Sequence, residues 1–174
     1  ATLYMPPIDN TTQVYANAGI ARNYDYDSAI VGTSVTENFR PSQMDELLGG
    51  RFIKLCTQSG TAYNHALLMD LAFRTHDICR IVYGLDVYSF IGATDKTGST
   101  VPFYLYDDNP FNDVSYWLNR SVLASFLPRC LKAWGQHQDD SIRDSMYCWA
   151  GRDEYGEAAL YNASFTAPQS EQPD

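Results

Sequence analysis

The chain has 174 residues, a length that suits about one domain with a buried core. Its hydrophobic fraction of 45% and charged fraction of 19% are those of an ordinary globular protein, and its formal net charge is -9. Lys and Arg are scattered singly, whereas a nucleic-acid surface needs clustered basic residues, so we expect no nucleic-acid partner. No run approaches the roughly 20 apolar residues of a membrane span, so we expect membrane contact only through an anchor outside this chain.

Residues 1–24 form a polar stretch without a strong period, and we expect an irregular arm there. Three short apolar runs follow it, each typical of a β-strand. The strands are predicted at Ser28–Val31, Arg51–Cys56 and Ile78–Val82. The third run is nearly continuous in apolar residues, which is typical of a strand that is covered on both faces.

Two helices are predicted between these strands. The first begins with Ser42 as a capping residue and ends at Gly49-Gly50. The second covers Thr61–Thr75, where apolar residues recur with a helical period. The order strand, helix, strand, helix, strand is typical of parallel βαβ units. The predicted fold class is therefore α/β, with three α/β/α layers around a parallel sheet.

The second half of the chain has weaker signals. The state of Val101–Tyr106 stays open, because turn residues bracket an apolar and aromatic run. Val114–Trp134 is predicted to be helical, with a kink or a break at Pro128. We place the α/β domain at residues 25–166 and a polar, mobile tail at residues 167–174.

The four cysteines form no Cys-x-x-Cys pair and no Cys/His spacing of a zinc site, so we expect no metal and no cofactor. Cys56 and Cys79 lie in apolar runs, where a free thiol usually serves as a small hydrophobic side chain. Cys130 and Cys148 flank a polar turn, and a disulfide between them stays an open alternative.

Each predicted strand ends in small and polar residues. Gly32-Thr33-Ser34 ends the first strand, Thr57–Gly60 follows the second, and Tyr83–Asp86 follows the third. Because the carboxyl ends of parallel strands gather at one edge of a sheet, we expect these three segments to lie together. A serine presented on such a turn is a candidate nucleophile.

This pattern resembles the SGNH (GDSL-like) hydrolase and acyltransferase superfamily over residues 25 to about 90. The segment Ile30–Ser34, followed by Glu37-Asn38-Phe39 and Pro41-Ser42, is similar to one group of SGNH-like proteins. These are membrane-anchored, extracytoplasmic proteins of Gram-positive bacteria related to the teichoic-acid D-alanylation protein. The resemblance implies a serine esterase or O-acyltransferase that acts outside the cytoplasm on a cell-envelope carbohydrate or teichoic-acid-like polymer.

The resemblance also implies roles for single residues. Ser34 would be the nucleophile, and the backbone N–H groups of Ser34 and Gly60 would form the oxyanion hole. Asp86 would lie beside that hole, where the superfamily usually has asparagine. Fixed N–H donors of this kind stabilise a developing oxyanion by several kcal/mol, of the order of 3 for each donor.

The superfamily's catalytic histidine, which typically follows an aspartate by three residues, has no counterpart. No such aspartate precedes any of the three histidines, His65, His76 and His137. We therefore expect this chain to be the front portion of a longer SGNH-like or flavodoxin-like domain, incomplete here and inactive as a fragment. A serine without a base is a poor nucleophile.

Structural interpretations of the same residues stay open. Ser34 and Glu37 also fit a capping box at a helix start. Gly60 also suits a simple turn, and Asp86 a helix cap. The alternative function is a non-catalytic envelope or binding module that retains the scaffold. A flavodoxin-like anion site is less favoured, because the first strand-end turn lacks further glycines and basic residues.

Overall fold

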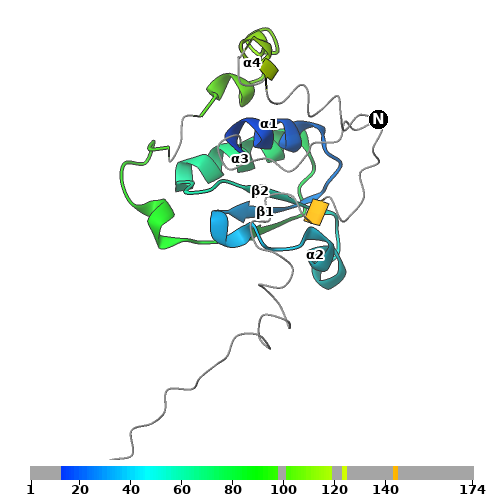
Figure 1. Cartoon of the computed structure of the whole chain (residues 1–174). Coiled ribbons are helices and arrows are strands. Elements are labelled where there is room, and N and C mark those ends of the chain that lie inside the picture. The colour runs from blue at the N-terminus through cyan, green and yellow to red at the C-terminus, as the bar shows by residue number, and fades with distance from the viewer. Residues whose placement is uncertain (1–12, 98–100, 119–122, 125–142, 145–174) are drawn as a thin grey trace, which may run out of the picture.

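The computed structural model describes residues 13–97, 101–118, 123–124 and 143–144. These residues form an α/β fold around a three-stranded parallel sheet (Figure 1). The strand order is β2-β1-β3. The strands are β1 (Ser28–Gly32), β2 (Phe52–Cys56) and β3 (Arg80–Tyr83). The predicted α/β class with a parallel sheet is therefore confirmed.

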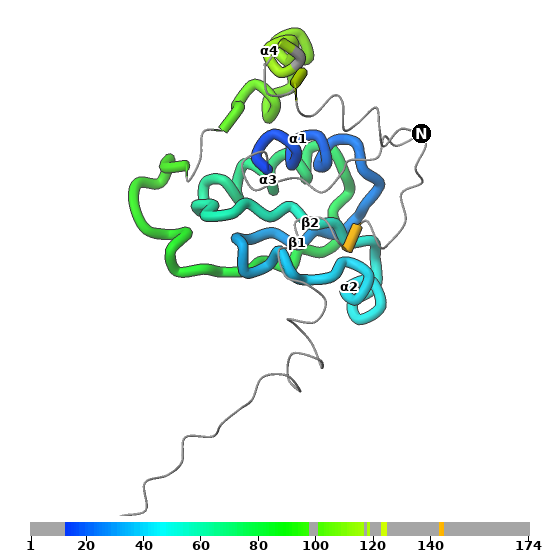
Figure 2. Tube along the Cα trace, viewed as in Figure 1, coloured from blue at the N-terminus to red at the C-terminus, as the bar shows by residue number. Residues whose placement is uncertain are grey.

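Helices cover both faces of the sheet. The longer helices α1 (Gln13–Asn23) and α3 (Ala62–Thr75) lie together on one face, and α2 (Pro41–Leu48) lies on the other (Figures 1 and 2). The remaining helical elements are η1 (Ser34–Thr36), η2 (Val87–Phe90), η3 (Phe103–Leu105) and α4 (Val114–Trp117). This arrangement gives three layers, α/β/α.

The core follows the two-residue period of a strand. Ala29 and Val31 of β1 join the large apolar cluster with α1 and α3, whereas Ile30 joins a smaller cluster with Phe52 and Cys56. Met44 of α2 packs against that second cluster. All residues of β1 and β2 are buried, as expected for strands in a sheet with helices on both faces.

The expected irregular arm at residues 1–24 is wrong for its second half. Residues from Gln13 onward form α1, which packs on α3 and β2, while residues 1–12 lie outside the described part. Helix α1 buries the polar residues Gln13 and Asn17 together with small apolar ones, so its sequence shows little amphipathic contrast. The folded domain therefore includes residue 13, rather than beginning at residue 25.

The boundaries of the two crossover helices are close to those predicted. Helix α3 has Thr61 as its N-cap, in a capping box with Asn64, and ends at Thr75. Helix α2 begins one residue before the predicted cap, with Pro41 in its first turn and Arg40 at the N-cap. Ser42 is not the capping residue. Both its backbone N–H and its hydroxyl donate to the carboxylate of Asp144.

Strand β3 differs from the prediction at both ends and in its burial. It spans Arg80–Tyr83, and among the described residues it pairs only with β1. Arg80 is exposed and the next three residues are half-buried. The expectation of a strand covered on both faces is therefore wrong for the described part of the chain. The edge position is not the reason, because β2 is an edge there too and is buried; α1 and α2 pack on β2, whereas no described helix packs as closely on β3.

Several other predictions fall partly or wholly outside the described residues. Val101–Tyr106 contains η3, and Val114–Trp134 begins with the short α4, while Pro128 and most of that range lie outside. The tail at 167–174, His137, Cys130 and Cys148 also lie outside. Among the described residues, no helix is both long and apolar enough to cross a bilayer.

The two cysteines that the structure describes are both free, as expected. Their surroundings differ. Cys56 is buried at the end of β2, whereas Cys79 is exposed just before β3. The interpretation as a small hydrophobic side chain is therefore confirmed for Cys56 and wrong for Cys79.

Candidate functional site

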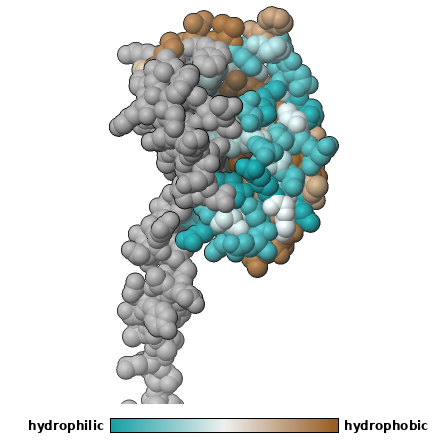
Figure 3. All heavy atoms as spheres, turned by 90° about the vertical axis from the view of Figure 1, so that its right-hand side faces the viewer, coloured by the Kyte–Doolittle hydropathy of each residue, from teal (hydrophilic) through white to brown (hydrophobic). Residues whose placement is uncertain are grey.

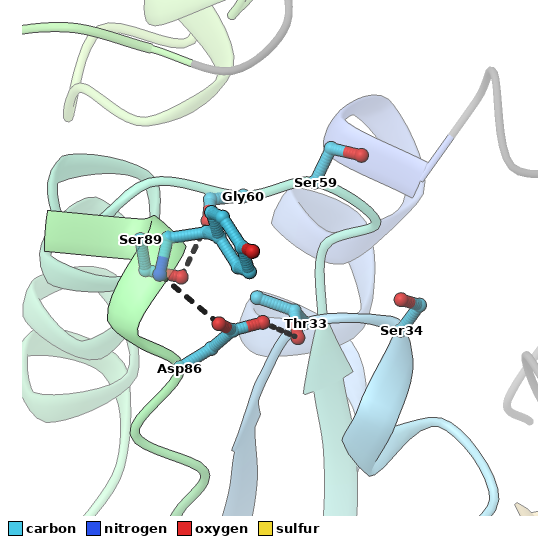
Figure 4. Close-up of a pocket in the computed structure, with 7 residues that line it drawn as sticks. Thr33, Ser34, Ser59, Gly60, Asp86 and Ser89 are labelled. Atoms are coloured by element: carbon cyan, nitrogen blue, oxygen red, sulfur yellow. Dashed lines mark hydrogen bonds between the residues drawn. The ribbon is translucent and has the colours of Figure 1, made fainter. Parts of the chain in front are cut away.

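The carboxyl ends of the three strands line one pocket of about 260 Å³ (Figure 4). The strands end nearly level, because Gly32 is paired with Cys56 and Val31 with Tyr83. The pocket-lining residues are Thr33, Ser34, Ser59, Gly60, Asp86, Tyr88 and Ser89. All three residues that the sequence singled out, from three separate loops, therefore meet at one place.

Ser34 stands on a tightly packed turn after β1. Thr36, two residues later in the chain, packs against Gly32 and Gly84. A Cβ added to Gly32 would lie 2.6 Å from the Thr36 hydroxyl oxygen, and a Cβ added to Gly84 would lie 2.3 Å from the Thr36 methyl group. The Thr36 hydroxyl also donates to the Thr33 carbonyl at 2.8 Å. Ser34 itself is half-buried and opens η1. The turn is thus held closely between β1 and β3, with the serine at the pocket.

The capping box considered for Ser34 and Glu37 is wrong. Thr33 precedes the first residue of η1 and makes no side-chain cap. The Glu37 side chain is fully buried and accepts a hydrogen bond from Gln13 Nε2 at 2.6 Å, away from the η1 start. Ser34 is therefore not placed at the pocket as a helix cap.

Gly60 closes a tight turn over the end of β2. Its N–H donates to the Thr57 carbonyl at 2.9 Å, and Ser59 has a left-handed φ of 54°. A Cβ on Gly60 would stand 2.8 Å from that carbonyl and 2.9 Å from Nε2 of His65. The turn interpretation of Gly60 is confirmed. Its N–H, which the resemblance assigns to the oxyanion hole, is engaged within the turn in this conformation.

Asp86 joins the loop after β3 to the loop after β1. One carboxylate oxygen accepts from the Tyr88 backbone N–H at 3.1 Å, and the other accepts from the Thr33 hydroxyl at 3.2 Å. Asp86 is the N-cap of η2, so the capping interpretation is confirmed. Ser89 of the same segment donates to the Gly60 carbonyl at 2.8 Å. Figure 4 shows these contacts linking the three loops across the pocket.

His65 lies directly beneath Gly60 and was not assigned to the site from the sequence. It is fully buried, its Nδ1 is 3.0 Å from the Tyr83 hydroxyl, and its Nε2 makes no hydrogen bond within the described residues. Burial lowers the pKa of His65, while the Gly32 carbonyl and the Asp86 carboxylate oppose that shift. Its place four residues after the Thr61 cap, in the first turn of α3, is the signal that could have located it.

Neither described histidine is an exposed base at the pocket. His65 is covered by the turn that contains Gly60. His76 lies elsewhere, where its Nε2 contacts the Tyr24 carbonyl at 2.8 Å and its ring stacks on Tyr26.

Helix α1 supports the pocket from behind. Asn17 Nδ2 donates to the Cys56 carbonyl at 2.8 Å, and Gln13 Oε1 accepts from the Gln58 backbone N–H at 2.7 Å. These bonds hold the segment that leads into Ser59 and Gly60. Sequence reasoning missed this contribution, because it treated residues 1–24 as an arm.

The pocket is rich in hydroxyl groups and contains one carboxylate. Among the described residues no Lys, Arg or His side chain lines it, and no cluster of three or more His, Cys, Asp or Glu is placed to hold a metal ion. Such a surface suits uncharged polar groups, such as an ester or a sugar hydroxyl, better than an anion.

Compared with known proteins, the chain matches no family model, no curated protein and no solved structure.

Proposed function

We propose that the chain carries the nucleophile of an SGNH-type serine esterase or O-acyltransferase, acting outside the cytoplasm on an acylated cell-envelope polymer. One observation supports this proposal above the others. Ser34, Gly60 and Asp86 come from three separate strand ends, and they line the same pocket. A half-buried serine on a close-packed turn at the carboxyl edge of a parallel sheet is well placed to attack a bound acyl group.

In the proposed reaction Ser34 Oγ attacks the acyl carbonyl and forms a new C–O bond. The ester C–O bond of the polymer breaks, and the serine proton passes through a general base to the leaving alkoxide. Water, or an acceptor hydroxyl, then attacks the acyl carbonyl and gives its proton through a general base to Ser34 Oγ, as the bond between the acyl carbon and Oγ breaks. That base is not His65, which is fully buried beneath Gly60.

The second candidate is a non-catalytic binding module that retains the scaffold. Two observations favour it. The Gly60 N–H donates to the Thr57 carbonyl. The two carboxylate oxygens of Asp86 accept hydrogen bonds from the Tyr88 backbone N–H and the Thr33 hydroxyl. An oxyanion hole requires the Gly60 turn to open, whereas a module that binds polar groups through hydroxyls does not.

Labelling with a fluorophosphonate probe separates the two candidates. The full-length protein is expected to take up about one probe per chain at Ser34, and Ser34→Ala is expected to lower the labelling rate by at least roughly 100-fold. The matched control is Ser59→Gly, which removes another pocket hydroxyl at a residue whose positive φ a glycine tolerates. This control is expected to keep its label.

Cooperative unfolding in urea confirms that each variant is folded before labelling. A folded full-length protein that takes no label, or a Ser34→Ala variant that labels as fast as wild type, contradicts the esterase proposal. Binding of the acylated polymer without labelling would then support the binding module.

A further inference from the structure

A run of exposed apolar side chains borders the pocket. Within seven consecutive residues the exposed fractions range from 56% to 81% at five large apolar positions. We name these five the apolar rim: Leu85, Val87, Tyr88, Phe90 and Ile91. They belong to η2 and its flanking residues, the green turn at the left of Figure 1. Exposed apolar side chains that gather in this way usually mark an interaction site.

The polar residues of this segment face inward, which is the reverse of the usual pattern. Ser89 is buried and donates to the Gly60 carbonyl, and Asp86 accepts from Thr33 and from the Tyr88 N–H. These bonds fix the orientation of η2. The apolar side chains therefore point outward because the polar ones anchor the segment to the pocket.

The apolar rim adjoins the pocket through Tyr88. Tyr88 lines the pocket and is also 81% exposed, and Asp86 and Ser89 alternate with rim residues along the chain. A ligand that extends out of the pocket past Tyr88 therefore reaches the apolar rim. By contrast, the coloured part of the face shown in Figure 3 is largely hydrophilic.

The charges near the apolar rim favour an uncharged occupant. Between Gly84 and Lys96 the charged residues are Asp86, Asp95 and Lys96, and the Lys96 side chain lies against Gly92. Two carboxylates and one ammonium group leave no net positive charge that would attract an anionic polymer or an anionic lipid surface. A hydrocarbon chain needs no such charge, and it gains by covering apolar surface.

We infer that the apolar rim binds the hydrocarbon chain of the acyl group whose ester carbonyl lies at Ser34. The preferred substrate class is then a medium- or long-chain acyl ester rather than an acetyl or alanyl ester. This inference rests on the proposed function for its ester chemistry, but the binding of the chain is measurable by itself. Each methylene covered by the rim is expected to raise affinity about three- to fourfold.

Two measurements test this inference. The first is displacement of a fluorescent fatty alcohol by ethanol, hexanol, octanol and dodecanol, each below its solubility limit, from wild type and from Ser34→Ala. The second is kcat/KM for the p-nitrophenyl esters of acetate, butyrate and octanoate. Affinity and kcat/KM are both expected to rise with chain length, and Ser34→Ala is expected to keep the binding while losing hydrolysis.

A matched pair of variants locates the binding surface. Leu85→Ser/Val87→Ser removes two rim side chains that are 72% and 78% exposed and is expected to weaken dodecanol binding at least tenfold. Leu47→Ser on α2 removes a side chain that is 77% exposed but lies outside the rim and is expected to change nothing. Both variants alter surface residues only, so neither threatens the fold.

The possible results distinguish the two proposals. If binding increases with chain length and requires the rim side chains, but no ester is hydrolysed, the esterase proposal is contradicted and the inference about the apolar rim is supported. The inference about the apolar rim is overturned if kcat/KM is equal for all chain lengths. It is also overturned if the rim variant and the Leu47 variant lose the same binding affinity. Binding to phosphatidylcholine vesicles without binding of monomeric dodecanol also overturns it, and indicates a membrane surface instead.

Discussion

At the residue scale, two ionisable side chains are fully buried beside the serine turn. Lys54 donates through Nζ to the backbone carbonyl of Glu37 at 2.9 Å and to that of Asp144 at 2.7 Å. The Glu37 side chain accepts from Gln13. Burial raises the pKa of Glu37 above its ordinary value of 4.5, although the Gln13 hydrogen bond and the Lys54 charge oppose the shift.

This pKa shift makes stability depend on pH in a defined direction. Because the folded protein holds the Glu37 proton more tightly than the unfolded chain does, the contribution of Glu37 to stability decreases as pH rises above about 4.5. Glu37→Gln removes the titration and keeps an oxygen acceptor for Gln13. The free energy of unfolding of the variant, minus that of wild type, is therefore expected to increase from pH 4 to pH 7. Urea denaturation at several pH values measures it, and a constant difference contradicts the assignment.

At the element scale, α1 is part of the site's framework. It packs on α3 and β2, and its buried polar side chains bind the backbone that leads from β2 into the Ser59-Gly60 turn. A buried carbonyl that loses its donor is costly. The stability of the pocket loop therefore depends on a helix that lies outside the strand-end motifs.

Asn17→Ala tests this role of α1. The change leaves the buried Cys56 carbonyl without its Asn17 donor and is expected to lower the free energy of unfolding by about 1–3 kcal/mol. The control Asn23→Ala removes an exposed bond to Gly19 in the same helix and is expected to change it by no more than about 0.5 kcal/mol. Urea denaturation measures both. Equal effects would indicate that α1 does not hold the β2 end.

At the scale of the whole molecule, the sheet brings together residues that are far apart in the chain. Thr33 and Asp86 are 53 positions apart yet joined by a hydrogen bond. Cys56 sits in the same sheet, fully buried, and burial raises the pKa of its thiol to about 12. Its reactivity therefore reports on opening of the whole sheet.

Thiol alkylation at pH 8, followed by peptide mass mapping, tests this packing. Exposed Cys79 is expected to react in the native protein, whereas buried Cys56 is expected to react at least roughly 100-fold more slowly, because a thiol without thiolate character in a closed core reacts only after unfolding. In denaturing urea the two are expected to react at similar rates. Comparable native rates contradict the buried sheet.

Much of the fold was predictable because its signals are local. The three strands and α3 lie within about two residues of their predicted ranges, since apolar periodicity and the Thr61 cap act over neighbouring residues. Helix α1 was not predicted because Gln13 and Asn17 are polar but buried. Their burial is explained only by hydrogen bonds to the distant backbone of Gln58 and Cys56. The burial of β3 was misjudged because no described helix packs on it as closely as α1 and α2 pack on β2.

The sequence by itself determined that Ser34, Gly60 and Asp86 follow three strands of a parallel sheet, and hence that they meet at one edge. Only the tertiary structure decided what their polar atoms do. The Gly60 N–H is engaged by Thr57, Asp86 links two loops, and His65 is enclosed beneath the pocket. The physical reason is that strand formation depends on neighbouring residues, whereas the partner of a hydrogen bond depends on which distant loops the fold brings within about 3 Å.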